Sequence, residues 1–157
     1  NYVALVSFKG TAVVASDFTA DPGRLSCKID NLAASGRVKS IYAALSSAKG
    51  LLDQIPDANA IKNVVLCSTG MTNKGPYDYW GHYNENTVGS EWYDTATDVN
   101  LYAYANSAYD LALELKNKGV AIYSIGLFDI SEDLPEDGKR IVAFLPLARI
   151  SHPGKVS

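Results

Sequence analysis

The sequence predicts an α/β fold: a doubly wound, mostly parallel sheet with one antiparallel edge strand. Two observations predict it. The chain opens on two β-rich runs joined by a short link, and after them short apolar runs alternate with segments of helical spacing. Alternating strands and helices favour a parallel sheet, and the opening hairpin adds an antiparallel strand at its edge. With no linker and no internal repeat, residues 1–157 are expected to form a single domain.

The hairpin is expected first in the order of elements. Residues 2–8 and 11–16 are apolar and rich in β-formers, and the two-residue link Lys9-Gly10 separates them. Two such runs around a short link that contains Gly indicate a β-hairpin. The second strand is expected to end at residues 17–19, and a turn is expected at residues 21–23, which read Asp-Pro-Gly.

Two helices and a strand follow. Residues 25–32 carry apolar side chains at helical spacing, and Ser40 is expected to cap a second helix whose apolar positions continue to Ile55. Residues 63–67 form a short continuous apolar run. Such a run is typical of a strand that is covered on both faces.

The later part of the chain contains a long polar segment and three more elements. Residues 71–98 have no sustained period and are expected to form an aromatic-rich insertion. A helix is expected from about Asn100 to Gly119, which would end it, followed by a strand over residues 120–128. Residues 139–147 have helical spacing and predict a last helix.

The composition excludes several classes of protein. The chain is 47% hydrophobic and 20% charged with a net charge of −3, so it is too apolar for a disordered protein. It also lacks the basic excess of most nucleic-acid-binding proteins. Its apolar runs are too short to cross a membrane, and two cysteines are too few for a disulfide framework. We therefore expect no nucleic acid as a partner and no direct membrane insertion.

One candidate site lies at the carboxyl ends of the strands, where open parallel sheets bind ligands. Ser68 and Thr69 directly follow the strand over residues 63–67. Lys39 and Ser40 precede a helix N-terminus, which would favour an anion or an oxygen-rich ligand. We expect these four side chains to meet at one edge of the sheet.

A second candidate surface lies in the insertion over residues 71–98. Long loops in compact domains are usually functional or disordered. Two interpretations of Tyr77, Trp80 and Trp92 stay open: the segment packs as a flap over the edge of the sheet, or these side chains bind a protein or a glycan.

The sequence contains no catalytic constellation, and we expect no enzymatic activity. His82 and His152 are far apart, without partners at ligand spacing, and are interpreted as surface residues. The acidic residues 129–137 are interpreted as a solvated loop rather than a weak calcium site. Cys67 is expected to be a small residue of the core, while a disulfide with Cys27 stays open as an alternative.

Several stretches resemble the von Willebrand factor A domain family, most closely its bacterial surface and pilus-tip versions, and they cover nearly the whole chain. Residues 3–8, 11–14 and 18–19 resemble its second and third strands, and Gly36 with residues 41–45 resembles the following turn and helix. Residues 62–73 resemble its fourth strand and loop, and residues 104–106 and 115–126 its late helix and fifth strand. The resemblance implies a Rossmann-like sheet with a long insertion after the fourth strand.

The metal-ion-dependent adhesion site of that family does not carry over. It uses an Asp-x-Ser-x-Ser motif, which is absent here, together with a Thr before the helix and an Asp after the fourth strand. Lys39 or Ser40 stands at the Thr position, and Thr69 at the Asp position. A cationic Lys39 and a neutral Thr69 do not favour a hard divalent cation. We expect no metal and no cofactor, unless residues upstream of Asn1 supply ligands for Mg²⁺. A further hypothesis is that the Lys39 ammonium group occupies the position of the ion.

The resemblance also implies that the first, central strand of the sheet is absent from this chain, which begins at Asn1 within a strand-like run. The gap would leave unpaired backbone groups and an apolar groove. We expect a strand from an upstream segment or from another chain to fill it. Direct pairing of residues 2–8 with residues 63–67 would contradict this expectation.

These observations predict a non-enzymatic binding or adhesion module of an extracellular bacterial surface or pilus-like protein, with a protein or glycan as its ligand. The alternative is a structural assembly subunit whose sheet is completed by a strand from another segment or chain. A small enzyme that uses Ser68 or Thr69 with Lys39 is a third interpretation, but no general base is identifiable.

Overall fold

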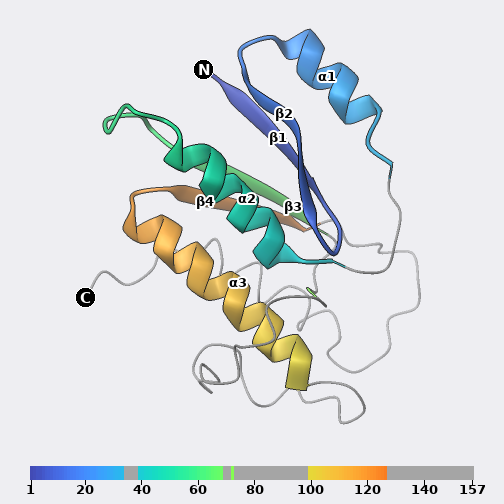
Figure 1. Ribbon diagram of the computed structural model, residues 1–157, viewed down its shortest axis with the longest axis vertical. Helices are drawn as coiled ribbons and strands as arrows, with labels where there is room; N and C mark the ends of the chain where they lie inside the picture. The colour runs from blue at the N-terminus through green and yellow to red at the C-terminus, as the bar shows by residue number, and fades with distance from the viewer. Residues whose placement is uncertain (34–38, 69–71, 73–98, 127–157) are drawn as a thin grey trace.

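The fold is α/β, as predicted, in a computed structural model that describes residues 1–33, 39–68, 72 and 99–126 (Figure 1). The elements are β1 (Val3–Phe8), β2 (Ala12–Thr19), α1 (Pro22–Asp30), α2 (Ile41–Asp53), β3 (Asn63–Ser68), α3 (Val99–Asn117) and β4 (Ala121–Gly126). The predicted insertion, the end of the predicted last strand and the helix over residues 139–147 lie outside the described residues. No described helix is both long and apolar enough to cross a membrane.

The hairpin is confirmed, although its link is longer than predicted. β1 and β2 pair antiparallel, and Phe8 lies opposite Ala12. Three residues, rather than two, therefore join the strands, and the Lys9 N–H donates to the Thr11 carbonyl at 2.8 Å. β2 ends at Thr19, within residues 17–19, where the sequence predicts the end of this strand.

The first helix starts earlier than predicted, at the residues expected to form a turn. Asp21 is its N-cap: one carboxylate oxygen accepts from the backbone N–H groups of Gly23 and Arg24 at 2.9 and 3.2 Å. Pro22 occupies the first helical position, where its missing N–H costs nothing. α1 buries none of its residues and lies on the outside of the molecule.

The second helix starts where the sequence predicts. The Ser40 hydroxyl accepts from the Ala43 N–H at 3.1 Å, so the expected cap is confirmed. Ile41 and Leu45 are completely or almost completely buried. The helix ends at Asp53, two residues before the predicted Ile55.

β3 and β4 form a parallel pair that α3 connects. The register runs from Asn63 opposite Ala121 to Ser68 opposite Gly126. Between α3 and β4, Gly119 has a φ of +80°, which a residue with a side chain adopts only with strain. The predicted role of this glycine at the end of the helix is confirmed.

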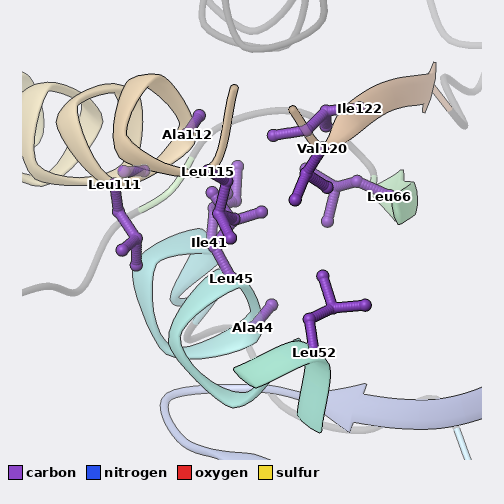
Figure 2. Packing of buried hydrophobic residues seen from close by; sticks show 11 residues of the cluster. Ile41, Ala44, Leu45, Leu52, Leu66, Leu111, Ala112, Leu115, Val120 and Ile122 are labelled. Carbon is purple, nitrogen blue, oxygen red and sulfur yellow. The ribbon is translucent and has the colours of Figure 1, made fainter. Parts of the chain in front are cut away.

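The core lies between α2, α3 and one face of the β3–β4 pair (Figure 2). Its buried residues are Ile41, Ala44, Leu45, Leu52, Leu66, Ala108, Leu111, Ala112, Leu115, Val120 and Ile122. Phe8 and Phe18 of the hairpin pack against the same cluster. α2 therefore packs against both pairs of strands.

The prediction that β3 is covered on both faces is wrong. Leu66 is buried, but Val65 is 60% exposed and Cys67 is exposed as well. Side chains alternate between the faces of a strand, and α2 and α3 cover only one of these faces. Cys67 is therefore not a core residue, and both it and Cys27 are exposed free thiols.

The four strands form two sheets rather than one. β1 pairs with β2, β3 pairs with β4, and among the described residues no strand connects the pairs. The direct pairing of β1 with β3 that would contradict a missing central strand is not observed.

Candidate functional site

The carboxyl ends of β1 and β3 meet at the N-terminus of α2. Lys9 directly follows β1, and its carbonyl accepts from the Ser40 N–H at 2.6 Å. Thr72 lies four residues after the end of β3, and its hydroxyl contacts the same turn of α2. The chain thus brings two strand ends and a helix start to one edge of the sheets. We call Lys39, Ser40, Ser68 and Thr72 the polar edge.

Thr72 makes the longest-range connection at the polar edge. Its hydroxyl accepts from the Ile41 N–H at 3.2 Å and donates to the Lys39 carbonyl at 3.1 Å. The side chain is buried. One hydroxyl therefore satisfies an amide that no intrahelical carbonyl reaches and a carbonyl of the preceding turn.

Thr72 is not among the site residues that the sequence predicts. One feature of the sequence could have indicated it, since Thr72 is a hydroxyl residue shortly after a predicted strand. In a fold of this kind strand ends approach helix N-termini, whose unsatisfied N–H groups need acceptors. Its partners lie 31 and 33 residues earlier in the chain, so only the tertiary structure identifies them.

Ser40 and Ser68 are both buried, at the start of α2 and the end of β3. Since Ser40 and Thr72 accept from the N–H groups of Ala43 and Ile41, two amides of the first turn of α2 already have protein partners. An anion at this N-terminus would have to displace these contacts. The predicted preference of this turn for an anion is thereby weakened.

Of the seven predicted site residues, the structure places Lys39, Ser40 and Ser68 on this edge. Lys39 is partly buried, and its carbonyl is held by Thr72. The other four lie outside the described residues: Thr69, Tyr77, Trp80 and Trp92. The hypothesis that the Lys39 ammonium group occupies the position of an ion stays a prediction.

A network of four charged side chains lies near the other end of α2. Lys49 and Lys118 each contact both Asp53 and Glu114, at N–O distances of 3.2 to 3.5 Å. The contact with Asp53 raises the pKa of Lys49, and the contact with Lys49 lowers the pKa of Asp53. This charge network connects α2 to α3 and is separate from the polar edge.

Within the described residues, no group of three or more His, Cys, Asp or Glu side chains is placed to hold a metal ion. The side chains of the polar edge are hydroxyls and one amine. They offer neutral or cationic groups rather than the carboxylates that a hard divalent cation prefers.

Comparison with solved structures finds the vWF domain of the type V pili tip protein Mfa5 from Porphyromonas gingivalis. The two chains superpose with a TM-score of 0.63 and 18% sequence identity, over 96% of this chain and 71% of the other. No protein-family model and no curated protein matches the sequence. At this identity the similarity establishes the fold. The chain therefore has a von Willebrand factor A-like, Rossmann-type α/β fold.

Proposed function

We propose that this chain is a non-enzymatic binding or adhesion module of an extracellular bacterial surface or pilus-like protein. The similarity in fold to a domain of a pilus tip protein supports the adhesion role and the location at the cell surface. Fold alone does not determine function, and the polar edge supplies the second support for this role.

The observation that carries the proposal is the convergence of β1, β3 and the start of α2. In open α/β sheets this edge is where ligands bind. The contacts described for Ser40 and Thr72 go to backbone groups, which fixes the shape of the edge. A polar edge whose backbone is held in one conformation is suited to bind the surface of a partner molecule.

The proposed ligand is a protein or a glycan, contacted by the polar edge and by aromatic residues of the insertion. Lys39, Ser40, Ser68 and Thr69 would supply polar contacts, and Tyr77, Trp80 and Trp92 apolar contact area. Aromatic residues are enriched where proteins bind tightly, since they combine a large apolar surface with a polar group.

The binding is tested with a glycan array and a panel of immobilised extracellular proteins as probes. W80A/W92A and K39A are each expected to reduce binding to the probes that the wild type retains. The matched control is K28A, because Lys28 lies on the exposed helix α1, away from the polar edge. Unchanged binding by both site variants would contradict the proposal.

We include in the proposal that binding does not require a divalent cation, because Lys39 and Thr69 do not fit the family's metal site. Calorimetric titration with MgCl₂ is expected to give no tight binding. Tight Mg²⁺ binding would show that our interpretation of these two residues is wrong.

A second candidate is a structural assembly subunit that accepts a strand. The separation of the four strands into two sheets favours it, since each sheet ends on an edge that faces no described strand. Size measurement by light scattering discriminates: a stable monomer of the 157-residue chain at all concentrations argues against this role.

A further inference from the structure

The turn before α2 is held by groups that arrive from two separate strands. The Lys9 carbonyl, directly after β1, accepts from the Ser40 N–H at 2.6 Å. The Thr72 hydroxyl, shortly after β3, donates to the Lys39 carbonyl at 3.1 Å and accepts from the Ile41 N–H at 3.2 Å. Lys39, Ser40 and Ile41 thus each have a backbone group bound to a distant part of the chain.

Both ends of a single peptide group are fixed in this way. The Lys39 carbonyl and the Ser40 N–H belong to the same peptide bond, whose atoms lie in one plane together with the Cα of Lys39. Thr72 holds the carbonyl and Lys9 holds the N–H. These two contacts set the orientation of the plane, and with it the position from which the side chain of Lys39 starts.

The contacts of Thr72 lie in a buried environment. Thr72 and Ser40 are each 2% exposed and Ile41 is 0% exposed, whereas Lys39 is only partly buried. Hydrogen bonds in such an environment are stronger than those in water, and an unsatisfied buried partner is costly. A rigid, buried turn therefore carries a lysine whose side chain is not itself fully buried.

Capping of α2 does not explain the contact between Thr72 and Lys39. The cap is Ser40, whose hydroxyl accepts from the Ala43 N–H within the helix. A helix N-terminus needs acceptors for its N–H groups, and the Thr72 hydroxyl supplies one to Ile41. The same hydroxyl also donates its proton to a carbonyl that precedes the helix. That second contact acts on the backbone of Lys39 and satisfies no amide of the helix.

A fixed backbone anchor increases the affinity that a flexible lysine can provide. The lysine side chain has four rotatable bonds and loses much of its rotamer freedom when it binds. Holding the anchor in its bound conformation beforehand reduces the total freedom that binding must remove. The ammonium group has three donors and no acceptor, so its partner on a protein or glycan would be a carboxylate, carbonyl or hydroxyl oxygen.

We propose that Thr72 is a positioning residue of the polar edge, which fixes the backbone of Lys39 and so directs its ammonium group toward an oxygen acceptor of the bound protein or glycan. Thr72 would not itself contact this partner, since its hydroxyl is buried and bonded to two backbone groups. The inference rests on the proposed function, in which Lys39 supplies a polar contact, and adds a residue that acts through Lys39.

The position of Lys39 is tested without a ligand, by the rate at which sulfo-N-hydroxysuccinimide acetate acetylates each lysine, measured by peptide mass spectrometry. We expect T72V to be acetylated at Lys39 at least about fivefold faster than the wild type, a factor that corresponds to about 1 kcal/mol. T72S keeps the hydroxyl and is expected to react like the wild type. Lys28, exposed on α1, is the internal control and should react equally in all variants. An unchanged rate at Lys39 in T72V overturns the inference.

Two further measurements separate positioning from a general loss of stability. G119A is expected to destabilise the chain at the opposite end of β4 from the polar edge and to leave the rate at Lys39 unchanged. Equal acceleration in G119A overturns the inference. Amide hydrogen exchange of the wild type does not depend on the folding of T72V. The N–H groups of Ser40 and Ile41 are expected to exchange slowly, and fast exchange at both overturns the inference as well.

The link to binding is tested by a double-mutant cycle of T72V and K39A, with the tightest-binding member of the glycan array or protein panel as the probe. We expect T72V to weaken binding about tenfold in the wild type, a factor that corresponds to about 1.4 kcal/mol, and less than about twofold in the K39A background. Equal losses in both backgrounds overturn the inference, because Thr72 would then act on the whole edge.

The K39A variant distinguishes failure of the inference from failure of the proposed function. If K39A weakens binding of the probe and T72V does not, the inference fails and the proposed function stands. If K39A has no effect on binding, the inference fails together with the role of Lys39 in the proposed function.

Discussion

Thr72 is the single residue on which the polar edge depends most, because one buried hydroxyl connects the segment after β3 to the start of α2. The T72V variant keeps the shape of the side chain but leaves the Ile41 N–H and the Lys39 carbonyl without this partner. Unsatisfied buried groups cost about 1–3 kcal/mol each. We expect T72V to lower the free energy of unfolding by at least about that amount, measured by urea denaturation.

The matched control is T72S, which keeps the hydroxyl. T72S is expected to retain most of the stability, losing chiefly the contacts of one methyl group. If T72V and T72S unfold at the same urea concentration, the hydroxyl does not hold this edge together.

Substitution of Gly by Ala is expected to have opposite effects on stability at Gly119 and at Gly50, although both positions have open space around them. No atom lies within 4 Å of a Cβ added at Gly119 or at Gly50, so neither change causes a clash. Gly119 has a φ of +80°, whereas Gly50 lies within α2. We expect G119A to destabilise by about 1 kcal/mol and G50A to stabilise by about 0.5–1 kcal/mol. Thermal unfolding of both variants measures the difference, and a shift in the same direction for both would refute the argument.

At the scale of elements, the charge network holds α2 against α3 and gives the stability a pH dependence. The pKa of Asp53 is lowered from its ordinary 3.8, so its stabilising effect is present above pH 3.8 and is lost as the pH falls further. The pKa of Lys49 is raised above 10.5, so its effect is present below that pH and is lost at more alkaline pH. Between pH 3.8 and pH 10.5 the contribution of these two groups to the free energy of unfolding is constant.

We therefore expect D53N to lower the melting temperature slightly at pH 7, because a partly exposed network contributes little, and by progressively less as the pH falls below 3.8. Calorimetric scans over that pH range measure the difference from the wild type. D17N is the control, since Asp17 is exposed on β2 and outside the network. A D53N effect that persists unchanged at low pH would exclude the charge of Asp53 as its cause.

The elements that the sequence predicts correctly are marked by residues at or next to their own ends. Ser40 before a helical repeat and Gly119 after one are each recognised within a single turn. Residues 21–23 have the composition of a turn and also of a capped helix start, so the start of α1 was not decidable. The exposure of Cys67 depends on what covers β3, and the role of Thr72 on residues more than 30 positions away. Neither the exposure of Cys67 nor the role of Thr72 can therefore be inferred from the residues next to it in the sequence.

At the scale of the whole molecule, an exposed apolar patch predicts self-association of the 157-residue chain. The patch, which we call the open face, consists of Val65 and Cys67 on β3 and their register partners Tyr123 and Ile125 on β4. Val65 and Ile125 contribute most of its aliphatic surface, and Thr keeps the β-branched shape while adding a hydroxyl. We expect V65T/I125T to weaken concentration-dependent association in sedimentation velocity experiments.

I61T is the control for this change. Ile61 is 90% exposed but lies outside the strands and apart from the open face. It should leave association unchanged, since an isolated exposed apolar side chain forms no patch. Equal effects of the two variants would mean that total hydrophobicity, rather than the open face, causes association.

The separation of the two sheets also has a consequence for cooperativity. No backbone ladder crosses from β1 to β3 in the described residues, so the hairpin is held to the rest by packing against α2 and by the contact between Ser40 and Lys9. None of the buried residues of the core cluster comes from the hairpin or from α1, and segments with few buried apolar side chains open at lower free energy than the core. We therefore expect the hairpin and α1 to open as one unit and α2, α3, β3 and β4 as another. A strand that paired with both β1 and β3 would join the two units through the backbone, and would turn two partly independent transitions into one.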